Sequence, residues 1–339
     1  MLQAGVLGKM KFLARTNKIM LTFAIAFCIS GVVLAAELPK KEASVVVELS
    51  AQNVDKRPVI SRIALSNDGR LMAIAGDDHQ LRILDARTGE LRQEFEAHLD
   101  WVRDVVFANT GDRIISVEQN GVVKIWDMAA LNSPTVLREK VLGARKVEIS
   151  PDGTKFAVCG YDPVVYCFDM TTQKLLYRFT APSESMTAMQ FSPDGSLLAA
   201  GGRNGIVRIW RLDIGSEVTN INGDSRRVNS LAFSPDGSRL ALGTNGSRIS
   251  IWNPLSGNMI SVLPERYGKT FSLQFCGPNI LASGESDNVI RLWDLNAGRE
   301  MTNLVGHTGT VSTLYYDEQL NSLVSGSFDT TIRYWALMQ

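Results

Sequence analysis

Three residues near the C-terminus have the side-chain types of a hydrolytic site. Ser325, His307 and Asp329 supply a hydroxyl, an imidazole and a carboxylate, the groups that Ser-His-Asp hydrolases use to generate a nucleophile. The run Asp77-Asp78-His79 suggests a metal site instead, although adjacent side chains rarely point at one ion. Which chemistry is possible depends on the elements that hold these residues.

A repeat of about 42 residues runs through most of the chain. Counting back from the C-terminus, a large apolar residue returns in a matching context at steps of 41 or 42 residues: Trp335, Trp293, Trp252, Trp210, Phe168, Trp126 and Leu84. Six residues before each of them stands a residue that is polar in all copies but one: Asp329, Asp287, Gly246, Asn204, Asp162, Asn120 and Asp78. A period in the low forties is typical of a propeller blade with four strands, so the sequence predicts seven blades.

Turn motifs and a dipeptide support this interpretation. The sequence Ser-Pro-Asp-Gly recurs at 150–153, 192–195 and 234–237, between runs of alternating apolar and polar residues that are typical of strands. Trp126-Asp127 and Trp293-Asp294 end their copies with the same dipeptide. On these residues the chain resembles the WD-repeat β-propeller family over residues 43–339. The resemblance implies an all-β, seven-bladed propeller of four-stranded antiparallel blades.

A strand near the N-terminus is predicted to close the ring. The segment Ser44–Leu49 has a strand-like sequence and precedes the first copy, whereas the seventh copy ends at Gln339, with no room for a fourth strand. Open blade edges leave backbone donors unpaired. We therefore expect the early strand to supply the missing outer edge of the last blade.

The repeat also offers a structural role for the candidate catalytic residues. The resemblance implies a hydrogen-bond set in which a buried indole N–H is joined through a hydroxyl and an imidazole to a carboxylate in a turn. This set is matched in the seventh copy by His307, Ser325, Asp329 and Trp335, in the second by His98, Ser116, Asn120 and Trp126, and in the sixth, without a histidine, by Ser283, Asp287 and Trp293. We favour this role over catalysis, and we expect no metal and no cofactor.

Charge and cysteine content limit the possible partners. The formal net charge is zero, but residues 1–35 hold four bases and no acid, so the remainder is mildly acidic. Such a body has no general attraction for nucleic acid. Cys159, Cys167 and Cys276 fall in predicted strands, and we interpret them as small buried apolar residues.

The N-terminus has the layout of a secretory leader. A basic region precedes the apolar run 19–34, and small residues follow before Glu37. We predict that residues 1–35 are a signal peptide or a membrane anchor and that residues 36–42 are a linker. Either form places the propeller in the periplasm, on the cell surface or outside the cell. A cytoplasmic scaffold with a spurious upstream leader stays open.

The predicted function is a binding platform. In the resembled family the usual partner-binding face, called the top face below, carries the entrances to the innermost strands and the turns between strands two and three. The repeat register places a mixture of aromatic and cationic residues there, a composition typical of interfaces: Trp101, Arg103, Arg145, Tyr161, Arg203, Arg227, Lys269, Phe271 and Phe328. We expect a monomeric, non-enzymatic scaffold that binds a partner protein or peptide with an acidic segment. The alternative is a periplasmic or surface enzyme with its site at the mouth of the central channel.

Overall fold

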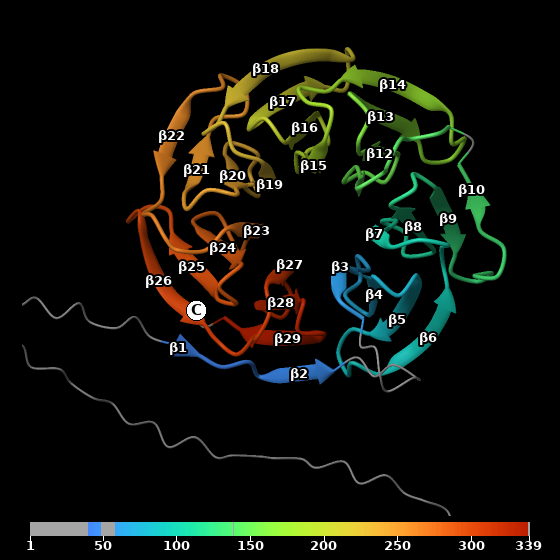
Figure 1. Cartoon of the computed structure of the whole chain (residues 1–339), viewed down its shortest axis with the longest axis horizontal. Helices are drawn as coiled ribbons and strands as arrows, with labels where there is room; N and C mark the ends of the chain where they lie inside the picture. Colours follow the sequence, from blue (N-terminus) through green and yellow to red (C-terminus); the bar gives the residue numbers. More distant parts are fainter. Residues whose placement is uncertain (1–39, 49–57, 138, 338–339) are drawn as a thin grey trace, which may run out of the picture. The chain divides into compact units, whose positions relative to one another are not determined.

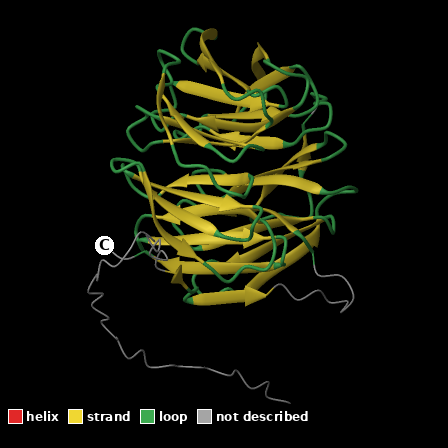
Figure 2. Ribbon diagram, turned by 60° about the vertical axis from the view of Figure 1, so that its left-hand side comes forward, coloured by secondary structure: helices red, strands yellow, loops and turns green. Residues whose placement is uncertain are grey.

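The computed structural model describes residues 40–48, 58–137 and 139–337. Over these ranges the chain forms 29 strands in seven sheets, arranged as blades around a common centre (Figure 1). The predicted all-β, seven-bladed propeller is confirmed. Figure 2 shows the strands joined by short loops, and no helix in the described part is long and apolar enough to cross a membrane. Residues 1–35, the predicted leader, and 36–39 of the predicted linker lie outside the described ranges.

In blades one to six, four consecutive strands form the blade and the first of them is innermost (Figure 1), whereas blade seven takes its outer strand from the N-terminus. Blade one contains β3 (Ile60–Leu65), β4 (Leu71–Gly76), β5 (Gln80–Asp85) and β6 (Leu91–Glu96); blade two contains β7 (Val102–Phe107), β8 (Arg113–Glu118), β9 (Val123–Asp127) and β10 (Thr135–Val136). Blade three contains β11 (Lys146–Ile149), β12 (Lys155–Cys159), β13 (Val164–Asp169) and β14 (Leu175–Thr180); blade four contains β15 (Met186–Phe191), β16 (Leu197–Gly202), β17 (Ile206–Arg211) and β18 (Ser216–Asn222). Blade five contains β19 (Val228–Phe233), β20 (Leu240–Thr244), β21 (Ile249–Trp252) and β22 (Met259–Val262); blade six contains β23 (Thr270–Phe275), β24 (Ile280–Glu285), β25 (Ile290–Asp294) and β26 (Arg299–Leu304). Blade seven contains β27 (Val311–Asp317), β28 (Ser322–Ser327), β29 (Thr331–Ala336) and β2 (Val45–Glu48).

The Ser-Pro-Asp-Gly sequences form the turns between the first and second strands. In blade three the Ser150 hydroxyl donates to Asp152 at 2.6 Å, and the Gly153 N–H donates to the Ser150 carbonyl at 2.8 Å. Gly153 has φ +71°, a conformation that costs little only for glycine. The turn chemistry therefore sets the strand register that the repeat requires.

The core consists of apolar layers between neighbouring blades. Trp126 of blade two packs with Ala73 and Leu81 of blade one, and Trp293 of blade six packs with Ile249 of blade five. Cys159, Cys167 and Cys276 are free and buried, as the sequence predicts. Because each layer needs two blades, the core is complete only when the ring closes.

The N-terminal strand closes the ring in the predicted way. β2 pairs antiparallel with β29, and Val47 lies opposite Ile332. Val47 also packs against a cluster shared by blades one and seven. Beside it, the Ser44 N–H and hydroxyl both donate to the Tyr334 carbonyl, at 2.8 and 2.9 Å. The strand thus joins the two ends of the propeller.

An additional pairing was not anticipated from the sequence. Residues 40–41, within the predicted linker, form β1 (Lys40–Lys41), which pairs in parallel with β26 of blade six. The Val305 N–H donates to the Lys41 carbonyl at 2.9 Å. Only backbone groups are needed for this pairing, so lysine side chains do not prevent it, and the polar composition gave no signal for it. The same segment therefore contacts both blade six and blade seven (Figure 1).

Candidate functional site

The candidate Ser-His-Asp residues of blade seven form a buried hydrogen-bond chain. Trp335 Nε1 donates to Ser325 Oγ at 2.8 Å, His307 Nε2 lies 2.7 Å from the same oxygen, and His307 Nδ1 lies 2.9 Å from Asp329 Oδ2. Because a carboxylate accepts, Nδ1 donates to Asp329 and Nε2 accepts from Ser325. Burial opposes ionisation of Asp329, but hydrogen bonds from His307, Thr331 and the Thr308 N–H outweigh it and hold its pKa well below the usual range.

The burial of Ser325 excludes it as a catalytic nucleophile. Ser325 has no exposed surface, and Trp335 is also fully buried. A catalytic serine must reach a substrate carbonyl, which this hydroxyl cannot do. The chain instead satisfies the indole N–H inside the blade.

Blade two has the same chain with a different acid. Trp126 Nε1 donates to Ser116 Oγ at 2.8 Å, and His98 Nε2 lies 2.7 Å from that oxygen. His98 Nδ1 lies 3.1 Å from Glu118, whereas the predicted Asn120 is exposed. Burial, with a smaller contribution from Lys124, lowers the pKa of His98 to about 3. The assignment of Asn120 was wrong because residues two apart on a strand share a face, so Glu118 reaches the site from β8.

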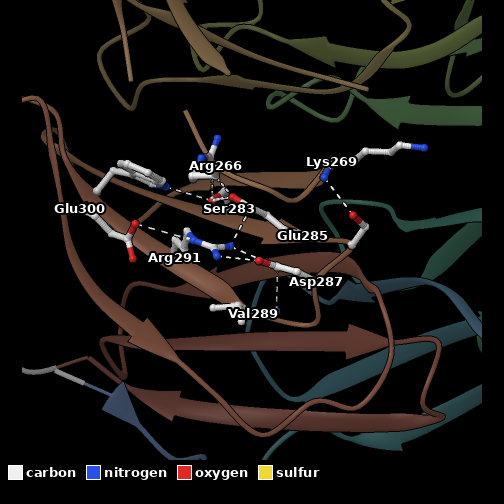
Figure 3. Close-up of polar contacts among 10 residues, drawn as sticks. Arg266, Lys269, Ser283, Glu285, Asp287, Val289, Arg291 and Glu300 are labelled. Atoms are coloured by element: carbon white, nitrogen blue, oxygen red, sulfur yellow. Dashed lines mark hydrogen bonds and ion pairs between the residues drawn. The ribbon is translucent and has the colours of Figure 1, made fainter. Parts of the chain in front are cut away.

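Blade six replaces the imidazole with an arginine (Figure 3). Trp293 Nε1 donates to Ser283 Oγ at 2.9 Å, and Ser283 donates to Glu285 at 2.7 Å. Arg266 forms an ion pair with Glu285, and its guanidinium lies 4.4 Å from the centre of the Trp293 ring. Burial lowers the pKa of Arg266 to about 10, with Arg291 adding to the decrease, so the group stays charged at neutral pH.

The predicted Asp287 belongs to the outer part of the same network. It pairs with Arg291 at 2.6 Å, and Arg291 also pairs with Glu285 at 2.7 Å. The Lys269 side chain extends away from these residues in Figure 3. A signal for Arg266 was present: blade six is one residue shorter, so position 266 corresponds to His307 and His98 once this deletion is included.

The Asp77-Asp78-His79 run does not converge on one point. Asp77 accepts from the Val59 N–H at 2.8 Å, Asp78 pairs with Arg82 at 2.5 Å, and His79 occupies a turn with φ 69°. Among the residues that the structure describes, no three His, Cys, Asp or Glu side chains gather in a way that could hold a metal ion.

The top face has a cavity at the mouth of the central channel. Its volume is about 490 Å³. It is lined by Val59, Ser61, Gly76, Asp77, Trp101, Val102, Arg103, Arg145, Lys146, Thr187, Arg227, Asn229, Phe271, Ser312 and Phe328. Six of the nine predicted partner-binding residues belong to this set: Trp101, Arg103, Arg145, Arg227, Phe271 and Phe328.

A second cavity, of about 820 Å³, lies at the rim near blades three, four and five. Its lining contains the predicted Tyr161, Arg203 and Arg227, together with Ser183, Glu184, Ser185 and Asn204. Lys269 lines neither cavity. The prediction therefore named residues of two adjoining sites and one residue outside both.

The equivalent residues at the start of the seven blades have two different roles. Four side chains donate to a carbonyl of the next blade: Ser61 to Val102, Thr187 to Val228, Asn229 to Thr270 and Ser312 to Ile60. These residues join neighbouring blades. The three remaining equivalents, Arg103, Arg145 and Phe271, line the mouth without making that bond, so they are available to a ligand.

The three arginines at the mouth have no carboxylate partner among the described residues, whereas Lys146 pairs with Asp104. Arg103 bonds to the Gln119 amide and lies 4.9 Å from the Trp101 ring centre. Arg145 Nη1 donates to the Tyr161 hydroxyl at 2.9 Å and lies 5.0 Å from its ring centre. Burial lowers the pKa of Arg145, and the nearby charges of Arg103 and Arg227 add to the decrease while Tyr161 opposes it.

Deeper in the channel the charges are matched. Asp104 is fully buried and pairs with Arg62 Nε at 3.1 Å and with Lys146 Nζ at 3.2 Å. Arg62 also pairs with Glu148 at 3.3 Å. By contrast, within the described ranges no acidic residue pairs with Arg103, Arg145, Arg203 or Arg227. Arginines without acidic partners among the described residues therefore line the cavities of the top face, whereas Asp104 and Glu148 compensate the charges deeper in the channel.

An apolar wall completes the mouth. Phe271 and Phe328 make an edge-to-face contact with ring centres 6.3 Å apart. Phe328 is 43% exposed and Trp101 44% exposed, values that leave large aromatic surfaces for a partner. The mouth thus offers cationic groups from blades two, three and five and apolar groups from blades six and seven.

Comparisons with known proteins agree with the fold. Four segments match the WD40 family, described as "WD domain, G-beta repeat": residues 89–127, 173–211, 215–253 and 298–336. Each segment joins the outer strand of one blade to the three inner strands of the next, so the sequence repeat is offset from the structural blade.

Similar curated proteins share only part of their length with this chain. Mitochondrial division protein 1 of Neurospora crassa is 39% identical over 82 residues, which are 24% of this chain and 12% of that protein. Polyadenylation factor subunit 2 of Candida albicans is 23% identical over 128 residues, 38% of this chain and 23% of that protein. Cell division control protein 4 of Saccharomyces cerevisiae is 39% identical over 59 residues, 17% of this chain and 8% of that protein. The chain thus spans less than a quarter of the length of each of these relatives.

Proposed function

We propose that this chain, four segments of which match the WD40 repeat, is an exported, non-enzymatic scaffold whose top face binds an acidic segment of a partner protein. The observation that carries this proposal is the group of guanidinium ions at the mouth that have no carboxylate partner in the described part of the chain. Elsewhere in the channel the charges are paired, as for Asp104 and Arg62. Charge-assisted hydrogen bonds from arginine to carboxylate are among the stronger polar contacts in proteins.

The mouth offers little for catalysis. Its described lining residues include one carboxylate, Asp77, and no histidine or cysteine. General acid–base or nucleophilic chemistry needs paired titratable groups. The hydroxyls of Ser61 and Ser312 are used in bonds to backbone carbonyls. A scaffold therefore fits this site better than an enzyme.

Export is supported by the sequence of residues 1–35, with their basic region followed by the apolar run 19–34. The periplasm, the cell surface and secretion are all compatible with that leader, as is retention by an uncleaved anchor. N-terminal sequencing of the exported protein separates these cases. A mature start near Ala36 supports cleavage, an intact N-terminus in the membrane fraction supports the anchor, and protein found only in the cytoplasm contradicts export.

Charge reversal tests the binding face. In the native envelope fraction, the wild-type chain is expected to capture a partner that the Arg103→Glu/Arg145→Glu variant does not. Arg211→Glu is the control because Arg211 is exposed at the far end of β17, outside both cavities. The captured partner should contain an acidic segment whose neutralisation, by Glu→Gln and Asp→Asn changes, also removes capture. Equal capture by the double variant and the wild type would place the site elsewhere.

A further inference from the structure

The mouth and the rim cavity adjoin each other on the top face. Arg227 lines both. Between them lies one stacked pair, in which Arg145 lines the mouth and Tyr161 lines the rim cavity, with Arg145 Nη1 bonded to the Tyr161 hydroxyl at 2.9 Å. Tyr161 is half exposed, at 50%. A chain lying across this pair therefore reaches both cavities.

The rim cavity contains a guanidinium and a hydroxyl that can bind an anion, and its lining also includes the carboxylate of Glu184. Arg203 is exposed and has no acidic partner among the described residues. Ser185 lines the same cavity, the residue is only 8% exposed, and its buried hydroxyl has no hydrogen-bond partner in the described structure. A buried hydroxyl without a partner costs free energy that a ligand acceptor would recover. Asn204, by contrast, already donates to the Pro182 carbonyl at 2.7 Å.

We propose that the top face recognises a segment with two acidic side chains at a defined spacing. One carboxylate occupies the mouth beside Arg103 and Arg145, and the other occupies the rim cavity beside Arg203 and the Ser185 hydroxyl. Arg227 lies between the two, and the backbone crosses the Arg145–Tyr161 pair. This proposal rests on the proposed function and adds the number and the spacing of the acids.

Two anchored acids are needed for useful affinity. A single exposed ion pair contributes little because solvent and salt screen it. When two such contacts belong to one chain, the second forms at a high effective concentration. A long polyanion such as nucleic acid is disfavoured, because the chain beyond residue 35 has more acids than bases and because the Phe271–Phe328 wall suits an apolar side chain beside the first acid.

Labelled peptides test the spacing directly. The probes are capped peptides with Phe-Glu at one end, a Gly/Ser spacer of one to six residues and a second Glu, compared with matched peptides in which the second Glu is Gln. Binding is measured by fluorescence anisotropy at two salt concentrations. One spacer length is expected to bind about tenfold more tightly than its single-Glu partner, the gain of one charge-assisted contact.

Two variants assign that gain to the rim cavity. Arg203→Gln should reduce the two-Glu peptide to the affinity of the single-Glu peptide and leave the single-Glu affinity unchanged. Arg211→Gln, the same change at the other end of β17, should alter neither.

Other results overturn the proposal. Affinity that rises with charge without a preferred spacing, a gain that survives in Arg203→Gln, or equal binding of a single-stranded oligonucleotide each contradicts a two-acid site. The proposed function is judged separately: it stands if the single-Glu peptide requires Arg103 and Arg145 even where the second acid adds nothing. If no peptide binds, both proposals fail.

Discussion

The strand that closes the propeller allows a paired test at adjacent residues. Val47 packs into the apolar cluster between blades one and seven, whereas Val46, its neighbour on β2, is 45% exposed. Gly89 of blade one also lies against Val47, since a Cβ added there would come within 2.5 Å of Val47 Cγ2. We predict that Val47→Asp destabilises the propeller and that Val46→Asp does not.

The size of the effect follows from the contacts. Loss of the half-buried Val47 side chain removes about 1 kcal/mol of apolar burial, and a carboxylate placed beside Val324 and Ile332 costs about 2 kcal/mol more. With an unfolding entropy of about 2.1 cal/mol/K per residue over roughly 300 residues, a loss of about 3 kcal/mol lowers Tm by ~5 °C. Val46→Asp should stay within about 0.5 kcal/mol, or ~1 °C.

Thermal unfolding followed by circular dichroism and tryptophan fluorescence measures both variants. Gly89→Ala tests the contact from the opposite side and should also lower Tm, because Gly89 has φ +72° and no space for a Cβ. Equal Tm values for Val47→Asp and Val46→Asp would show that β2 is not docked with the observed face inward. That result would refute closure by this strand.

Three further outcomes follow from local geometry. Thr330 is β-branched at φ 69° and its hydroxyl is buried without a partner in the described structure, so Thr330→Asn should stabilise by about 1 kcal/mol in urea unfolding. Asn288→Thr, the reverse change at the equivalent turn, should destabilise by a similar amount. A destabilising Thr330→Asn or a stabilising Asn288→Thr would contradict the strain. Arg266→Gln leaves the buried Glu285 with weaker compensation, and we expect a loss of about 3 kcal/mol, whereas a loss below about 1 kcal/mol would show that Arg291 alone neutralises the acid. The pKa of His98 is about 3 in the folded protein and about 6.5 in the unfolded chain, so the unfolded chain binds the proton first as the pH falls. The contribution of neutral His98 to stability is therefore complete above pH 6.5 and is lost as the pH falls toward 3. In a plot of the urea midpoint against pH, His98→Gln should reduce the slope between these two values. An unchanged slope in that variant would assign the acid sensitivity to other groups.

Sequence periodicity predicted most of the fold for a simple reason. Each blade repeats the same sequence features, namely turn residues, strands of alternating polarity and a large apolar residue near the end of the third strand. A feature that is missing from one copy can therefore be located by comparison with the other six. Closure was predictable by counting strands, since the last copy lacks one and β2 (Val45–Glu48), within the predicted segment Ser44–Leu49, supplies it. β1 was not predictable, because two lysines pairing through their backbone leave no pattern in side-chain types.

Parts of the candidate site were harder to predict. Six of the nine residues that the register named for partner binding line the mouth, and their role in binding stays a prediction. The register did not separate Arg103 and Arg145, which face the channel, from Ser61 and Ser312, which join neighbouring blades. That difference depends on whether the side chain places a hydrogen-bond donor against a backbone carbonyl of the next blade. Nor did it identify Ser185 as a buried hydroxyl without a partner.

The sequence by itself determined the number of blades, their order, the outer strand contributed by the N-terminus and the aromatic landmarks, because these depend on local periods that any copy displays. Tertiary structure decided which acid ends each hydrogen-bond chain, Glu118 in place of Asn120 and Glu285 beside Arg266, and which arginines lack acidic partners. Those outcomes depend on distances between strands and between blades. Ion pairing and burial are properties of such distances, so a one-dimensional repeat limits the candidates but cannot select among them.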